Sequence, residues 1–261
     1  MSVAEAAARG HLESTWAVVN GLRMHARVGD RLAPAGAKAV VLVHGVGVSS
    51  RYMVPLAEQL APDYRVFAPD LPGFGRSDKS PRLLDVRGLA DTLAAWLRVV
   101  GLDRPALFGN SLGCQVIIDL AGRHPELVER AVLLGPTTDP RVGNVIRLIG
   151  RGVLDLPHES PALYPVLVAD YLRAGPVRTV RTLQAGVDDP LTVKLPRVRA
   201  PVLVVRGDRD PIAPRRWVRE MAERLPAGRW TEVTGAAHAA HFSAPDRVAE
   251  LIRPFLDGDE N

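Results

Sequence analysis

The sequence predicts an α/β fold with a mostly parallel, eight-stranded sheet, helices on both faces and an inserted helical cap. Short apolar or β-branched runs alternate with segments of helical spacing along most of the chain, as they do in parallel sheets. The interval 135–199 breaks this alternation, because it holds apolar helical stretches and no strand signal. With 261 residues, of which 47% are hydrophobic, the chain is long enough to form one sizeable core.

The first predicted element is an antiparallel hairpin. Asn20-Gly21 separates Thr15–Val19 from Leu22–Val28, and this dipeptide is typical of a type I′ turn. The run Lys38–Val43 is continuous and β-branched, which is typical of a strand buried on both faces. Further strands are expected at 64–68, 106–108, 131–134, 202–205 and 229–233. Helices are expected at 52–61, 86–100, 215–225 and 245–256, with one more that ends near residue 124.

The interval without strands contains three apolar helical patches, Val142–Leu154, Leu163–Ala174 and Val177–Ala185, which are separated by prolines. We expect it to form a cap across the mouth of the sheet. The predicted organisation is therefore a core of residues 1–134 and 200–261 with a cap of residues 135–199. Ordinary scaffold helices are the alternative interpretation.

The sequence around Ser111 is the centre of the functional prediction. An apolar strand run meets Gly109-Asn110-Ser111-Leu112-Gly113, and a helical segment follows. A serine on such a sharp turn is held in a strained conformation that exposes its hydroxyl, and the flanking glycines give it room. The helix that starts there directs backbone N–H groups at the reaction site. This arrangement indicates a nucleophilic serine.

A serine nucleophile needs a base, and the base needs an orienting acid. Acidic residues follow the predicted strand 202–205 in the run Gly207-Asp208-Arg209-Asp210, and both Asp208 and Asp210 are candidates. Histidines follow the last strand at His238 and His241.

Composition argues against several other classes of protein. The net charge is +4, but the basic residues are dispersed, so no nucleic-acid partner is expected. Met1–Gly10 is interrupted by Glu5 and Arg9, so we expect no secretory signal, and no apolar run approaches membrane-spanning length. The single cysteine, Cys114, excludes an internal disulfide and favours a cytoplasmic location. No cluster has metal-ligand spacing, so neither metal nor cofactor is expected.

Four motifs occur in the order and spacing of one known family. They are His44-Gly45-x-Gly47, Asp70-x-x-Gly73-x-Gly75-x-Ser77, Gly109-x-Ser111-x-Gly113, and Gly207-x-x-Asp210-x-Ile212-x-Pro214 with the late His238. Over about Thr15 to Leu256, the chain resembles the α/β-hydrolase fold family.

The resemblance assigns roles to individual residues. It implies Ser111 as nucleophile, Asp210 as orienting acid and His238 as base, with Asp208, Asp139 and His241 as alternatives. The oxyanion-hole N–H groups would come from Val46 and Leu112, and His44 would brace its loop. Gly45 and Asn110 are expected to contact the substrate.

The predicted reaction is hydrolysis of carboxylic esters of medium-sized hydrophobic substrates, with or without an anionic group, through an acyl-enzyme. An alternative is carbon–carbon bond hydrolysis of dienol keto acids, as in meta-cleavage product hydrolases, in which a cap arginine and a Trp after the catalytic His hold a carboxylate. Arg173, Arg178 and Arg181 are candidates for that arginine, but Ala239 stands in place of the Trp. A third possibility is a ligand receptor without catalytic activity.

Overall fold

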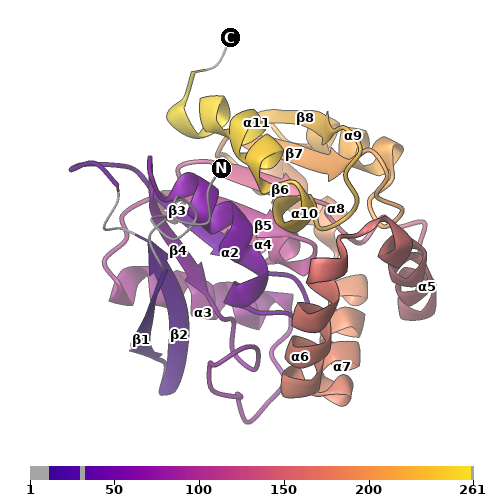
Figure 1. Ribbon diagram of the computed structural model, residues 1–261, viewed down its shortest axis with the longest axis horizontal. Coiled ribbons are helices and arrows are strands. Elements are labelled where there is room, and N and C mark those ends of the chain that lie inside the picture. Colours follow the sequence, from indigo (N-terminus) through magenta and orange to yellow (C-terminus); the bar gives the residue numbers. More distant parts are fainter. Residues whose placement is uncertain (1–11, 30–32, 260–261) are drawn as a thin grey trace.

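The computed structural model describes residues 12–29 and 33–259, so the prediction about Met1–Gly10 falls outside them. Eight strands form one sheet in the order β1-β2-β4-β3-β5-β6-β7-β8 (Figure 1). β2 pairs antiparallel with β1 and β4, and the other pairs are parallel. The strands are β1 (Glu13–Val19), β2 (Leu22–Gly29), β3 (Ala39–Val43), β4 (Arg65–Pro69), β5 (Ala106–Asn110), β6 (Ala131–Leu134), β7 (Val202–Gly207) and β8 (Gly228–Val233). The predicted mostly parallel, eight-stranded sheet is confirmed.

The hairpin at the edge of the sheet forms at the predicted dipeptide. Asn20 and Gly21 have φ values of 51° and 78°. A type I′ turn needs positive φ at both central positions, and asparagine and glycine tolerate it best. The turn joins β1 and β2, with Val19 opposite Leu22.

The core lies on both faces of the sheet. Val41 and Val43 pack on one face of β3, and Val40 and Leu42 on the other, as the two-residue period of a strand requires. Helices α3 (Val86–Val99), α4 (Leu112–Arg123) and α9 (Arg215–Arg224) contribute to the first cluster. Helices α2 (Ser50–Leu60), α10 (Ala240–Ser243) and α11 (Pro245–Asp257) contribute to the second. A single 3₁₀ turn, η1 (Pro125–Leu127), follows α4.

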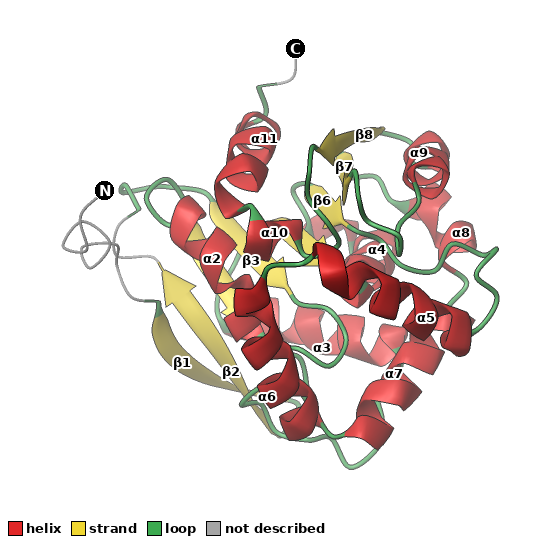
Figure 2. Cartoon of the chain, turned by 45° about the vertical axis from the view of Figure 1, so that its right-hand side comes forward, coloured by secondary structure: helices red, strands yellow, loops and turns green. Residues whose placement is uncertain are grey.

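Residues 135–199 between β6 and β7 form helices without a strand, as Figure 2 shows. The elements are α5 (Val145–Asp155), η2 (Leu156–His158), η3 (Pro161–Leu163), α6 (Tyr164–Ala174), α7 (Pro176–Asp188), α8 (Leu191–Lys194) and η4 (Leu195–Arg197). The Asn144 side chain caps α5 by accepting a hydrogen bond from the Arg147 N–H at 2.9 Å, so α5 begins three residues later than predicted. Pro161 and Pro176 lie in the first turns of their helices, where a missing N–H costs nothing.

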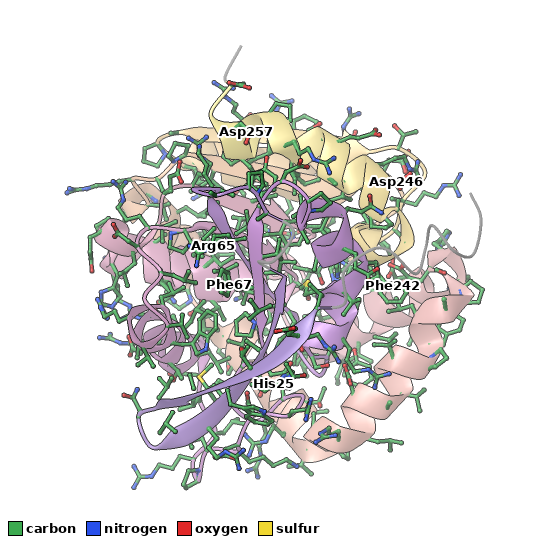
Figure 3. All side chains as sticks on the ribbon, turned by 60° about the vertical axis from the view of Figure 1, so that its left-hand side comes forward. His25, Arg65, Phe67, Phe242, Asp246 and Asp257 are labelled. Atoms are coloured by element: carbon green, nitrogen blue, oxygen red, sulfur yellow. The ribbon has the colours of Figure 1, made fainter. Side chains whose placement is uncertain are left out.

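A buried carboxylate, Asp70, organises the loop that follows β4. It accepts hydrogen bonds from the backbone N–H groups of Ser50 (2.6 Å) and Arg76 (2.8 Å). It also bonds the ring of His25 on β2, labelled in Figure 3, at 2.8 Å. A Cβ on Gly75 would lie 2.3 Å from this carboxyl group, which explains the glycine in the predicted Asp-Gly-Gly-Ser motif. Burial raises the pKa of Asp70, but the hydrogen bond from His25 and the other contacts hold it below its usual value.

Candidate active site

Ser111 lies on the turn between β5 and α4 in a conformation that is rare for a residue with a side chain. Its φ and ψ are 57° and −121°. Such backbone strain costs about 1–3 kcal/mol and persists only where the surrounding structure enforces it. A Cβ on Gly113 would lie 2.3 Å from the carbonyl oxygen of Val43, and one on Gly109 would lie 2.8 Å from the backbone of Gly113. The two glycines therefore allow α4 to start close against β3 and β5.

His238 and Asp210 form a buried hydrogen-bonded pair at the carboxyl ends of the last two strands. His238 Nδ1 lies 2.9 Å from Asp210 Oδ2. The other carboxylate oxygen of Asp210 accepts from the backbone N–H groups of Ile212 (2.7 Å) and Ala213 (3.0 Å). Because Nδ1 carries the proton of this pair, His238 Nε2 keeps its lone pair available whenever the ring is neutral.

The pair has perturbed proton affinities. Burial raises the pKa of Asp210, but the charge of His238, its hydrogen bond and the two backbone N–H groups hold this pKa below its usual value. Burial lowers the pKa of His238, but Asp210, Asp155 and Glu159 together raise it to about 9.

A glycine that the sequence analysis did not single out makes room for the His238–Asp210 pair. Gly135, directly after β6, has φ 58°. A Cβ there would lie 2.8 Å from His238 Nδ1 and 3.1 Å from Asp210 Oδ2. Its position after the strand 131–134 was the only signal in the sequence.

The alternative acids have other partners. Asp208 accepts a hydrogen bond from the Gly235 N–H at 2.7 Å and is exposed. Asp139 is buried and pairs with Arg216 at 2.9 Å and with Arg141 at 3.4 Å. Only Asp210, among these three, bonds a histidine.

The alternative base, His241, is enclosed in the core against Tyr52, with ring centroids 4.3 Å apart. Its ring nitrogens lack a hydrogen-bond partner of ordinary geometry among the described residues. Burial, with a smaller effect of the His238 charge, lowers the pKa of His241 to about 3. A ring that is neutral and without an acid partner lacks the orientation that a general base needs.

The loop that begins at His44 lies against the serine. A Cβ on Gly45 would be 3.1 Å from Ser111 Cβ. His44 is buried and braces this loop: its Nδ1 donates to the Gly45 carbonyl at 2.7 Å, and its Nε2 accepts from the Leu71 N–H at 2.9 Å. Leu112 is the first residue of α4, and the first N–H groups of a helix have no partner within it.

Asn110 was expected to contact the substrate. Its side-chain amide donates to the carbonyl oxygens of Leu134 and His238, each at 3.2 Å. Its Oδ1 is buried without a partner among the described residues. Asn110 lines the cavity. Its two hydrogen bonds also connect the loop that carries His238 to β5 and β6.

A cavity of about 510 Å³ brings five of the predicted residues together, whereas Leu112 and Asp210 are not part of its lining. Gly45, Val46, Asn110, Ser111 and His238 all line it. The remaining lining is mostly apolar and comes largely from α5, α6 and α7. Several of these side chains, such as Val153, Leu172 and Val180, are also exposed to solvent, so they lie at the mouth of the cavity.

Two cavity residues were missed by the sequence analysis. Asp155 and Glu159 line the cavity beside His238, although both come from the helical segment 135–199. Nothing local in the sequence marks them, because acidic residues on a helical segment are ordinarily solvent-facing. Conversely, Arg173, Arg178 and Arg181 are absent from the cavity lining.

No group of three or more His, Cys, Asp or Glu side chains could hold a metal ion among residues 12–29 and 33–259. Over the same ranges, no helix has the length and apolarity that crossing a membrane requires.

Cys114 is buried behind Ser111, with Sγ 3.3 Å from the carbonyl oxygens of Gly109 and Leu134.

Known proteins share this architecture. The thermophilic esterase from Thermogutta terrifontis superposes with a TM-score of 0.79 at 22% identity, covering 95% of this chain and 100% of that one. The enol-lactonase from Burkholderia xenovorans LB400 gives a TM-score of 0.77 at 23% identity, covering 93% of this chain and 100% of that one.

Sequence relatives agree with this likeness. The pimeloyl-[acyl-carrier protein] methyl ester esterase of Neisseria meningitidis serogroup B is 30% identical over 254 residues, covering 86% of this chain and 95% of the relative. The putative carbamate hydrolase RutD of Yersinia enterocolitica is 27% identical over 259 residues, covering 89% and 92%. The model of the alpha/beta hydrolase family matches residues 40–251. This chain therefore belongs to the alpha/beta hydrolase family.

Proposed function

We propose that this chain is a serine hydrolase that cleaves carboxylic esters of medium-sized hydrophobic substrates through an acyl-enzyme. One observation carries the proposal: Ser111, in its strained backbone conformation, and His238, whose ring is hydrogen-bonded to the buried Asp210, line the same largely apolar cavity. The cavity volume of about 510 Å³ lies within the range of about 300–1,000 Å³ usual for small-molecule sites.

In the proposed mechanism, Ser111 Oγ attacks the ester carbonyl carbon while its proton passes to His238 Nε2. The carbonyl oxygen becomes an oxyanion, which the backbone N–H groups of Val46 and Leu112 stabilise. Collapse of this intermediate breaks the bond to the alcohol oxygen, and the alcohol leaves with the proton from His238. Water then attacks the acyl-enzyme in the same way, and Asp210 holds the imidazole in its orientation throughout.

The charges around the cavity favour this reaction over carbon–carbon bond hydrolysis of dienol keto acids. That reaction needs a cation to hold the substrate carboxylate, for which arginine is best suited. No arginine or lysine lies among the described residues that line the cavity. Asp155 and Glu159 do line it, and they would repel a carboxylate.

The partner and location follow as parts of the same proposal. We expect a small hydrophobic ester as the substrate. A cytoplasmic location is supported by the presence of one cysteine in the whole chain, which suits a reducing compartment.

The test combines labelling and kinetics. A fluorophosphonate probe should label the wild type and the control variant Ser80→Ala, and Ser111→Ala should not react, because only an activated serine is phosphonylated. Hydrolysis of 4-nitrophenyl esters of graded chain length should fall on the order of a millionfold in kcat in Ser111→Ala. Unlabelled wild type would indicate a ligand receptor, and residual turnover within tenfold of wild type would remove Ser111 from the mechanism.

A further inference from the structure

Two carboxyl groups outside the proposed triad contact the loop that carries His238. Asp155 ends α5, and its Oδ1 accepts a hydrogen bond from the backbone N–H of His238 at 3.3 Å. Glu159, just after η2, accepts through Oε1 from the backbone N–H of Ala239. The two side chains belong to residues that are only 5% and 7% exposed, and both line the cavity. Neither group is used by the proposed mechanism.

The two carboxyl groups interact with each other as well. Burial raises the pKa of both, and the negative charge of Asp155 helps to raise that of Glu159 to about 7. Glu159 Oε2 is buried and receives no hydrogen bond from a nitrogen or hydroxyl donor of the described residues. Apart from a proton shared with Asp155, nothing in the described part of the chain offsets a negative charge on this oxygen by hydrogen bonding.

The balance of charge in the cavity is negative. Its charged lining groups, within the described ranges, are His238, Asp155 and Glu159, and Asp210 lies directly behind His238. When His238 is protonated, Asp210 offsets its charge. The pair formed by Asp155 and Glu159 still carries at least one negative charge after sharing one proton. Because both carboxyl groups are largely buried and the cavity lining is mostly apolar, such a charge acts more strongly on a bound ion than it would in bulk water.

We propose that Asp155 and Glu159 set the charge that a substrate can carry, so that the cavity accepts uncharged or cationic esters and rejects esters that bear a carboxylate. This inference rests on the proposed ester hydrolysis at Ser111 and specifies its substrate class. It differs from the expectation from sequence, which allowed an anionic group on the substrate.

The test uses three esters with acyl chains of equal length. They are 4-nitrophenyl hexanoate (neutral), the mono-4-nitrophenyl ester of adipic acid (anionic) and 4-nitrophenyl 6-(trimethylammonio)hexanoate (cationic). For the wild type at pH 7.5, we expect kcat/KM to be at least tenfold lower for the anionic than for the neutral ester. The cationic ester should be hydrolysed at least as well as the neutral one.

The variants remove charge and keep shape. Asp155→Asn and Glu159→Gln retain an oxygen that can accept from the backbone N–H groups of His238 and Ala239. In the double variant, the anionic-to-neutral ratio of kcat/KM should rise at least tenfold, and the cationic-to-neutral ratio should fall. These ratios cancel any change in the basicity of His238, because all three substrates use the same base. Asp188→Asn is the matched control, since it removes an exposed carboxylate of α7 that does not line the cavity.

Each outcome decides one question. If the wild type hydrolyses the adipate ester as fast as the hexanoate ester, or if the double variant and Asp188→Asn give the same ratios, the proposal is overturned. If the double variant fails to fold, the wild-type comparison and Glu159→Gln alone still decide it. If Ser111→Ala keeps its activity on the neutral ester, the proposed function itself has failed, and that result is separate from any change in the ratios.

Discussion

The protonation state of His238 should control the rate at neutral pH, and removing one nearby carboxylate should raise that rate. A protonated imidazole cannot accept the proton of Ser111, so kcat/KM should rise with pH until His238 is neutral. With a pKa of about 9, only about one molecule in a hundred has a neutral His238 at pH 7. Wild-type activity at pH 7 should therefore be about a hundredfold below its alkaline plateau.

The perturbation is Asp155→Asn. Asp155 is one of the charges that raise the pKa of His238, and its Oδ1 lies 3.3 Å from the His238 backbone nitrogen. The asparagine keeps an acceptor for this N–H but loses the charge, so the pKa of His238 should fall and the acidic limb should move to lower pH. Each unit of that displacement raises the rate at pH 7 about tenfold, so the variant should be faster than the wild type there.

The assay is kcat/KM on 4-nitrophenyl hexanoate from pH 5.5 to 10, read at the isosbestic wavelength of nitrophenol. Ser111→Ala supplies the background rate at each pH, and Asp188→Asn is the control for general loss of charge. A wild-type limb centred at or below pH 6.5, the ordinary value for histidine, would refute the reasoning. So would an Asp155→Asn limb displaced to higher pH.

Three other predictions follow. The fold holds His241 neutral by lowering its pKa to about 3, so the free energy of unfolding should decrease as pH falls below the histidine pKa of the unfolded chain, about 6.5. In urea unfolding, the free energy of unfolding of the wild type should decrease by about 2 kcal/mol more than that of His241→Leu between pH 7 and pH 5. Equal decreases in the two proteins would contradict this prediction. Leu167 lines the cavity and Val168 is exposed outside it, so Leu167→Ala should shift the preferred acyl chain to longer esters, whereas Val168→Ala should not; matching chain-length profiles would assign Leu167 to the scaffold alone. Loss of an arginine from α6 or α7 should leave kcat/KM on simple esters within a few-fold of wild type, and a loss above about a hundredfold on a carboxylate-bearing ester would restore the carbon–carbon hydrolase hypothesis. The variants are Arg173→Ala, Arg178→Ala and Arg181→Ala.

The strands could be predicted from sequence because their signals are local. Asn20-Gly21 specifies a turn through its own backbone preferences, and Val40–Val43 is apolar at every position because both faces of β3 are covered. The predicted strands end within two residues of the observed ends. The serine turn is equally local, since Gly109, Ser111 and Gly113 lie within five residues.

The contacts that bring Asp155 and Glu159 to the histidine loop were not predictable from the sequence. Asp155 lies 83 residues before the histidine whose N–H it accepts, and Glu159 lies 80 residues before Ala239. Only the folded chain shows that these acidic side chains turn inward. Helix α10, at four residues, is too short to leave a periodic pattern.

The same two contacts bear on the proposed division into a core and a cap at residues 135–199. The loop that carries His238 is held from the core side by Asp210 and from the helical segment by Asp155 and Glu159. All three carboxyl groups raise the pKa of His238.

A movement that carried Asp155 and Glu159 away from this loop would therefore lower the pKa of His238 while it opened the cavity. It would also free the backbone N–H groups of His238 and Ala239. Such a movement would thus couple the position of the helical segment to the pKa of His238 through two side chains, and in the proposed mechanism residues 135–199 would influence the chemistry as well as the shape of the cavity.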